Sequence, residues 1–206
     1  RHVGLDVIMD LLSENGVKLY RTDAGHPWGG PAGIVDARDV VLIKVNCQWK
    51  CRGTTNTDLL RGLIHRILEH PDGFAGEVVI FENGQGRGSL NCDTSQAYGD
   101  SSVHANANND KHTFLYLIEH IFADARVSSF LLDPVMYSFI ADNDHKTDGF
   151  RVLGTVSYPC FNTKGGHHVE LKDGIWNGNK HLPNLKLINV PVLKHHDVGG
   201  SEITGV

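Results

Sequence analysis

Two pairs of adjacent histidines are the clearest candidates for chemistry in this sequence. The pairs are His167 with His168 and His195 with His196. Imidazole nitrogens, completed by a nearby carboxylate such as Glu170 or Asp197, bind zinc, iron and nickel. Because neighbouring side chains of a β-strand point to opposite faces, only one histidine of each pair can bind a given ion without help from a turn. We therefore predict a transition-metal site drawn from these four histidines. The alternative is that they are partly exposed polar residues of glycine-rich loops. The other histidines, His145 and His181 among them, are assigned to helices, helix ends and polar loops.

A second group of polar side chains stands at the ends of three apolar runs, residues 40–46, 77–83 and 185–191, that are typical of buried β-strands. The polar residues at their carboxyl ends are Lys44, Asn46, Glu82, Asn83 and Asn189. In a parallel sheet these ends lie at one edge, where ligands bind. We therefore expect a shared ligand-binding site at this edge. The alternative is that the same residues cap strands and hydrogen-bond to loop backbone.

Two residues after the third run suggest what such a site could do. Lys194 and His196 follow that run closely. Lys44 and Lys194 would hold a small anion, and His196, whose side chain titrates near neutral pH, would act as acid or base. We predict Lys44, Lys194 and His196 as catalytic residues of an enzyme that acts on a small anionic substrate by acid–base or metal-assisted chemistry. The one cofactor that the sequence indicates is a transition metal ion.

A glycine-rich segment, residues 84–89, follows the second run and carries Arg87. Main-chain N–H groups of such loops can bind phosphate. The Gly-x-Gly-x-Gly spacing lacks the last interval of the dinucleotide-binding fingerprint, and the segment leads into a polar loop instead of a clear helix. We expect Arg87 to bind a smaller anion together with Lys44 and Lys194.

Hydrophobic periodicity predicts the elements that must position these residues. Apolar residues at helical spacing predict helices over residues 3–12, 59–68 and 113–122, and strands are expected at 17–20, 40–46, 77–83, 127–132 and 185–191. Strand, helix and strand with short links form a βαβ unit, which implies a parallel sheet. Short strand-like pieces between residues 150 and 169 predict a hairpin or meander. We therefore predict an α/β fold in a single domain, 1–206. Its mainly parallel sheet has flanking helices and an irregular β-rich insertion, 133–184.

The composition is that of a globular protein without a basic excess. The chain has 19 Lys+Arg and 24 Asp+Glu, a formal net charge of −5, and 40% hydrophobic residues. This excludes disorder over most of the chain and a broadly cationic nucleic-acid binder. No apolar run approaches the roughly 20 residues that cross a bilayer. The first residue is Arg, which indicates a processed or truncated product. The location stays open, with an extracytoplasmic one favoured.

The four cysteines do not decide the redox environment. Cys47 and Cys51 are near enough in sequence to form a disulfide, and they could equally remain thiols. Their spacing lacks the two-residue interval of a zinc knuckle or a thioredoxin motif, so a metal pair is the weakest of the three readings.

Four segments in this order resemble the bacterial and archaeal family called domain of unknown function 362. The segments are Leu-Ile-Lys-Val-Asn at 42–46, Gly-Thr-Thr at 53–55, Ile-Asn-Val-Pro-Val-Leu-Lys-His-His at 188–196 and Ile-Thr-Gly-Val at 203–206. The resemblance implies an α/β fold and adds Thr54 and Thr55 to the ligand-binding residues. Val45 and His195 replace the family's proline and threonine, and the family continues beyond the position of Val206, which implies a chain truncated at its C-terminus. The family is distantly similar to the N-terminal domain of nickel-pincer lactate racemases, which favours a site with histidines.

Two classes of function follow from these patterns. The first is the enzyme described above. The second is a non-catalytic module that binds a ligand or assembles with copies of itself, and export from the cell is one option for it. The enzyme reading requires Lys44, Glu82, Lys194 and His196 to converge around an open pocket.

Overall fold

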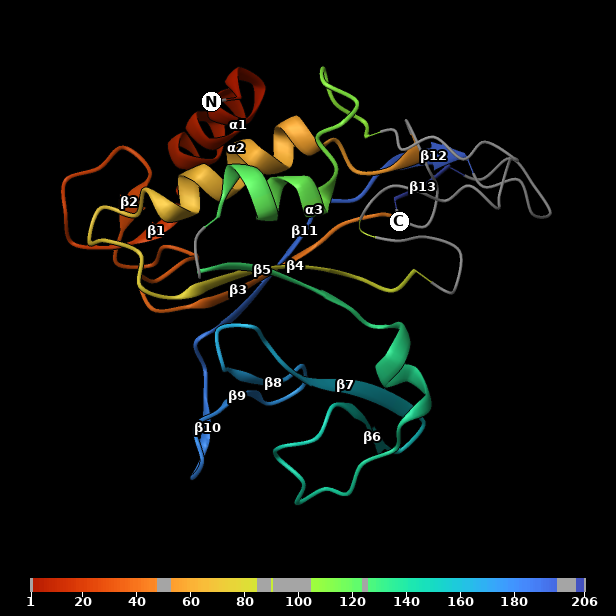
Figure 1. Cartoon of the computed structure of the whole chain (residues 1–206). Helices are drawn as coiled ribbons and strands as arrows, with labels where there is room; N and C mark the ends of the chain where they lie inside the picture. Colours follow the sequence, from red (N-terminus) through yellow and green to blue (C-terminus); the bar gives the residue numbers. More distant parts are fainter. Residues whose placement is uncertain are drawn as a thin grey trace.

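The computed structural model describes residues 2–47, 53–84, 90, 105–123, 126–195 and 203–205. These residues form three layers (Figure 1): helices above, a parallel β-sheet in the middle and an antiparallel β-sheet below. The chain thus mixes helices with a parallel sheet, and this part of the fold prediction is confirmed. The division into a single domain with an insertion stays a prediction.

The middle layer is a four-stranded parallel sheet in the order β11-β3-β4-β5. Its strands are β3 (Val40–Lys44), β4 (Glu77–Glu82), β5 (Val127–Leu131) and β11 (Leu185–Asn189). β3 and β4 are buried on both faces, as their continuous apolar runs predict. The prediction that 185–191 forms a buried strand is wrong in its burial, because β11 is an edge strand and Leu187 is 56% exposed.

The helical layer packs on the upper face of this sheet. Its helices are α1 (Val3–Glu14), α2 (Thr57–Leu68) and α3 (Phe114–Tyr116), the last continuing as a π-helical turn, η3 (Leu117–Ile121). α2 begins where Asn56 accepts a hydrogen bond from the N–H of Leu59, 2.9 Å long. The apolar side of α2 then packs on the alternate residues of β3 and β4, such as Val41 and Ile80. β3, α2 and β4 therefore form the parallel βαβ unit that the sequence predicts.

The lower layer is an antiparallel meander in which the five strands follow one another in chain order. A 3₁₀ turn, η4 (Asp133–Tyr137), leads into β6 (Gly149–Leu153), β7 (Val156–Asn162), β8 (His168–Glu170), β9 (Gly174–Trp176) and β10 (His181–Leu182). Phe161, Val169 and Ile175 on its upper face pack against Leu42 and Val79 of the parallel sheet. The two sheets thus share one apolar core.

A buried carboxylate reinforces this contact between the sheets. Glu77 at the start of β4 accepts hydrogen bonds from the hydroxyls of Ser128 and Thr163 and from the N–H of Gly165. A side chain at Gly165 would collide with the Glu77 carboxylate. The turn between β7 and β8 is therefore tied to the parallel sheet, which fixes the position of β8.

Two small strand pairs complete the described residues. β1 (Tyr20–Arg21) pairs with β2 (Gly29–Gly30), and β12 (Leu193–His195) pairs with β13 (Ile203–Gly205). In the part of the chain that the structure describes, no helix is long and apolar enough to cross a membrane. The polar loop expected after the glycine-rich segment 84–89 falls largely on residues 91–104, which lie outside the described residues.

Candidate metal centre

A cluster of histidines surrounds one carboxylate on the lower face of the antiparallel sheet. In β8, Val169 points into the shared core, so the alternation of a strand turns His168 and Glu170 to the opposite face. His181 of β10 and His145, from the loop before β6, approach the same carboxylate. Four histidine and glutamate side chains from three segments thus meet at one place.

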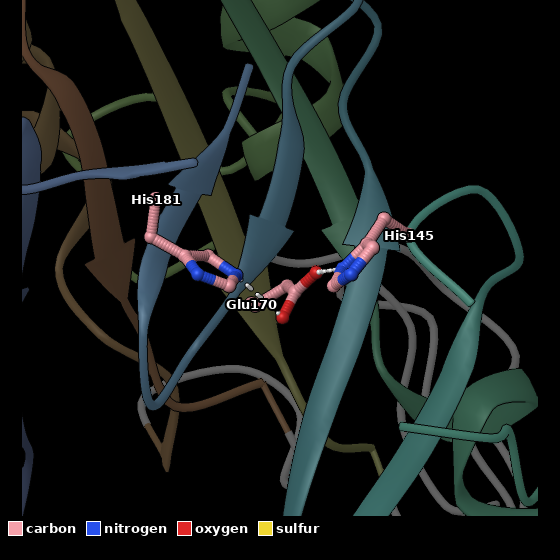
Figure 2. Close-up of side chains that lie close together, drawn as sticks. All are labelled: His145, Glu170 and His181. Atoms are coloured by element: carbon pink, nitrogen blue, oxygen red, sulfur yellow. Dashed lines mark hydrogen bonds and ion pairs between the residues drawn. The ribbon is translucent and has the colours of Figure 1, made fainter. Parts of the chain in front are cut away.

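The Glu170 carboxylate lies between two imidazole rings (Figure 2). Nδ1 of His145 is 2.5 Å from Oε1, and Nε2 of His181 is 2.8 Å from Oε2. One ligand atom from each of the three residues lies within 4.8 Å of the other two. The Glu170 side chain is 1% exposed, whereas His145 and His181 are 21% and 28% exposed. The carboxylate is therefore buried, and the two rings separate it from solvent.

Cross-strand packing holds the two rings. The imidazole of His145 stacks on the indole of Trp176, with the ring centroids 3.8 Å apart and the planes 16° from parallel. Trp176 is also the cross-strand partner of His181 and of His168. Aromatic neighbours of this kind restrict the rotation of an imidazole. The loop histidine is consequently held in place by β9.

Arg151 of β6 is the cation of the cluster. Its guanidinium donates hydrogen bonds to both oxygens of Glu170 and to the main-chain oxygens of Asp144 and Ala141. One of its nitrogens is also 3.2 Å from Nδ1 of His145. The side chain is 12% exposed. Arg151 therefore neutralises Glu170 and fastens the loop that carries His145.

The protonation of His168 follows from its neighbour Asn162. The amide nitrogen of Asn162 donates to the main-chain oxygen of Lys146 and to Asp148, both at 2.8 Å, so the amide oxygen must face His168. That oxygen is 3.0 Å from Nδ1 of His168, which therefore carries the proton. In the neutral ring Nε2 is then a bare acceptor. This atom is buried, has no hydrogen-bond partner among the described residues and lies 3.6 Å from Oε1 of Glu170.

The surroundings set the charges of these groups. Burial acts to raise the pKa of Glu170, but the hydrogen bonds from His145, Arg151 and His181 outweigh it and lower the pKa below the ordinary value. Burial lowers the pKa of His168, so its ring is neutral at neutral pH. Burial also raises the pKa of the nearby Cys160 thiol to about 11, which keeps it protonated. The cluster thus combines an ionised carboxylate with a neutral imidazole.

An open pocket of about 250 Å³ adjoins the cluster. His145, Glu170, His181 and Arg151 form one part of its lining, and Val152, Leu153 and Leu171 form an apolar part. Tyr158, Cys160, Lys172, Asp142 and Asp173 complete it. A small molecule could therefore reach both rings and Arg151 from solvent.

The predicted residues at the carboxyl edge of the parallel sheet are not part of this cluster. Nζ of Lys44 donates a hydrogen bond of 3.2 Å to Glu82. The hydroxyl of Thr55 accepts from the N–H of Asn46 and donates to the carbonyl of Val190, both at 2.8 Å. These contacts join β3, the segment before α2 and the end of β11. Lys44, Glu82, Asn46 and Thr55 thus do lie near one another.

Other residues of the predicted edge are placed only in part. Asn189 is the register partner of Lys44 and is exposed, Thr54 is buried, and Asn83 follows the carboxyl end of β4. Burial raises the pKa of Glu82, although the hydrogen bond from the N–H of Asn83 and the ammonium of Lys44 act to lower it.

Several of the predicted residues are not described by the structure. They are Arg87, His196 and Cys51, together with the side chains of Lys194 and His195. The predicted convergence of Lys44 with Lys194 and His196 therefore stays a prediction.

The metal-ligand residues predicted from the sequence overlap only partly with the observed cluster. The sequence indicated Glu170 and His168, which the structure joins on one face, whereas His167 precedes β8 and is not in the cluster. His145 and His181 were assigned to loops. The one local signal for their role was that each is a histidine in a polar segment, one before and one after β8. The pairing of three short strands brings them together.

Comparison of the chain with protein-family models, curated proteins and solved structures finds no match, so the resemblance to domain of unknown function 362 stays a prediction.

Proposed function

We propose that this chain binds a divalent transition-metal ion through His145, Glu170 and His181, and that the ion serves metal-assisted chemistry on a small molecule in the adjoining pocket. The observation that carries the proposal is the mutual approach of one ligand atom from each residue to within 4.8 Å. Two imidazoles and one carboxylate are a donor set of catalytic zinc sites, in which a further position stays open for water or substrate. The pocket beside the cluster provides room for that position.

The three ligand atoms can reach one metal ion after a modest rearrangement. Metal–nitrogen and metal–oxygen bonds of about 2.0–2.2 Å place three ligand atoms roughly 3.3–3.8 Å from one another. The three atoms here lie within 4.8 Å of one another. Rotations of the partly exposed His145 and His181 side chains would bring them to these separations.

The bare nitrogen of His168 supports the same proposal independently. Two acceptors, Nε2 of His168 and Oε1 of Glu170, lie 3.6 Å apart in a buried position. Unpaired acceptors are costly to bury and are usually hydrogen-bonded. A cation bound to Glu170 would meet this nitrogen as well. His168 would then contribute to the field of the site or act as a further ligand.

The residues around the ion would have separate roles. A bound divalent ion lowers the pKa of a water ligand to about 7 and polarises substrate oxygens. Trp176 orients the ring of His145, and Asn162 fixes the tautomer of His168. Such outer contacts typically tune metal sites as strongly as the ligands' own chemistry does.

A second candidate function concerns the carboxyl edge of the parallel sheet. The Lys44–Glu82 pair stands at the edge where parallel sheets bind ligands, and the family resemblance includes this segment. We propose it as an anion-binding enzyme site only if Lys194 and His196 join it. Glu82 already neutralises Lys44, which makes this the weaker candidate.

Zinc titration of the purified, tag-free protein by calorimetry tests the proposed function. We expect one zinc ion per chain. Loss of a single ligand should weaken binding by at least about 100-fold, since the loss of outer-shell partners alone costs 10–100-fold. His145→Ala and His181→Ala are suitable variants because both side chains are partly exposed.

The matched control is His167→Ala, which removes a histidine next to β8 that does not belong to the cluster. This variant should bind zinc like the wild type. If the wild type binds no zinc, or if all three variants bind alike, the cluster is a hydrogen-bonded network that only stabilises the sheet.

A further inference from the structure

Arg151 is a largely buried cation whose carboxylate partner is Glu170. The guanidinium bonds both Glu170 oxygens, and its other acceptors are the main-chain oxygens of Asp144 and Ala141. Those two carbonyls hold it at the wall of the pocket independently of Glu170. The position of Arg151 would therefore persist even if the carboxylate were engaged elsewhere.

Metal binding would change the charge balance around Arg151. The Glu170 carboxylate has about four lone-pair sites, and Arg151, His145 and His181 now occupy them. An ion held by both histidines would take the sites that the histidines now use, so a divalent ion and the guanidinium would share the single negative charge of Glu170. Burying positive charge without a compensating negative charge is strongly unfavourable. The metal-loaded site consequently favours a new anion beside Arg151.

The lining of the pocket indicates the chemical class of that anion. The planar fork of an arginine matches a carboxylate with two parallel hydrogen bonds. Leu153 and Leu171 offer an apolar wall, and the pocket of about 250 Å³ accommodates only a small molecule. A ligand that fills this pocket therefore needs both a carboxylate and a hydrocarbon part.

We propose that the metal-loaded pocket binds a small monocarboxylic acid, with its carboxylate on Arg151 beside the metal ion and its short hydrocarbon chain on Leu153 and Leu171. This inference rests on the proposed metal site and names its substrate class. The metal ion adds positive charge to the site, and the carboxylate of the acid adds the negative charge that balances it. Their affinities are therefore coupled, and the coupling is reciprocal: zinc tightens the binding of the acid by the same factor as the acid tightens the binding of zinc.

Calorimetry with butyrate as the probe tests the coupling. We expect zinc-loaded protein to bind butyrate at least about 10-fold more tightly than zinc-free protein, within the usual range of coupling between sites. Butyramide, which has the same length and no charge, should not show this gain. The binding of zinc to butyrate without protein, and butyrate binding by His181→Ala in zinc, serve as blanks.

Two substitutions locate the effect at Arg151. At zinc concentrations that saturate each variant, Arg151→Gln should lose the zinc-dependent gain for butyrate, and Arg151→Lys should recover only part of it because a lysine lacks the fork. Lys172→Gln is the matched control: this lysine lines the same pocket, but its side chain is 41% exposed and paired with Asp173. It should bind butyrate like the wild type. Circular dichroism verifies that each variant is folded.

The outcomes separate the two proposals. If wild-type protein binds zinc but butyrate binds equally with and without zinc, the carboxylate inference is wrong and the metal site stands. If Arg151→Gln keeps the full gain, the acid does not bind at Arg151. If wild-type protein binds no zinc, the proposed function itself fails.

Discussion

At the scale of single residues, Glu170 is the central residue of the candidate metal site. One side chain receives hydrogen bonds or close contacts from His145, Arg151, His168 and His181 while it is 1% exposed. Buried charges persist in proteins only when they are paired and hydrogen-bonded. Substitutions that separate Glu170 from Arg151 should therefore lower the free energy of unfolding more than substitutions in a surface ion pair.

Replacing Glu170 by Gln preserves its shape and removes its charge. We expect Glu170→Gln to abolish zinc binding and to lower the free energy of unfolding by about 3–5 kcal/mol, because Arg151 is left buried without a counter-charge. The control Glu69→Gln removes a carboxylate from Arg66 that is 48% exposed, and Arg66 keeps Asp6. That loss should stay below about 1 kcal/mol. Equal losses in urea denaturation of the two variants would contradict the account.

The same comparison has a predicted pH dependence. The folded-state pKa of Glu170 lies below the ordinary value of 4.5. Its ionised form therefore stabilises the fold fully above the ordinary carboxyl pKa, and this contribution is lost as the pH falls through the lowered folded pKa. The difference in stability between wild type and Glu170→Gln should be constant near neutral pH and shrink below pH 4.5.

At the scale of elements, the tight pairing of β9 with β10 positions His181. Gly174 has a positive φ of 111°, and a side chain there would meet the carbonyl oxygen of Leu182 at 2.3 Å. Leu182 is the neighbour of His181 in β10. The absence of a side chain at Gly174 thus lets β10 come close enough for His181 to reach Glu170.

Gly174→Ala tests this dependence against a matched glycine. Gly178, in the loop between the same strands, has φ of 92° and nothing near its side-chain position. Each alanine carries a backbone cost of about 1–2 kcal/mol from its left-handed conformation. Only Gly174→Ala should also push β10 away and weaken zinc binding by at least about 10-fold, the lower range for disturbed support of a ligand. Weakened zinc binding in Gly178→Ala, or unchanged binding in Gly174→Ala, would count against it.

The elements also differ in how far the sequence predicts them. β3, α2 and β4 were predicted within a few residues because their signals are local: continuous apolar runs and helical spacing. The burial of β11 was predicted wrongly, because its run of Leu187 and Ile188 does not reveal that the strand lies at the edge of the sheet. Strand order depends on pairings that are distant in sequence.

At the scale of the whole molecule, the site exists because two sheets share a core. Phe161 and Val169 anchor the meander under Leu42 and Val79, and Glu77 ties the β7–β8 turn to the parallel sheet. This arrangement turns the opposite face of β8, with Glu170, toward the pocket. His145 and His181 lie 25 and 11 residues from Glu170 in the chain, so no local pattern joined them. The sequence alone could place Glu170 and His168 on one face because they lie two residues apart in a strand.

The position of a bound ion tests the central claim most directly. Crystals grown with zinc should show one anomalous-scattering peak per chain, bounded by Nδ1 of His145, Nε2 of His181 and the Glu170 carboxylate at about 2.0–2.2 Å. The account predicts that bonds to the ion then replace the hydrogen bonds that His145 and His181 now make to Glu170. A zinc peak only at other residues, or an empty cluster at saturating zinc, would contradict it.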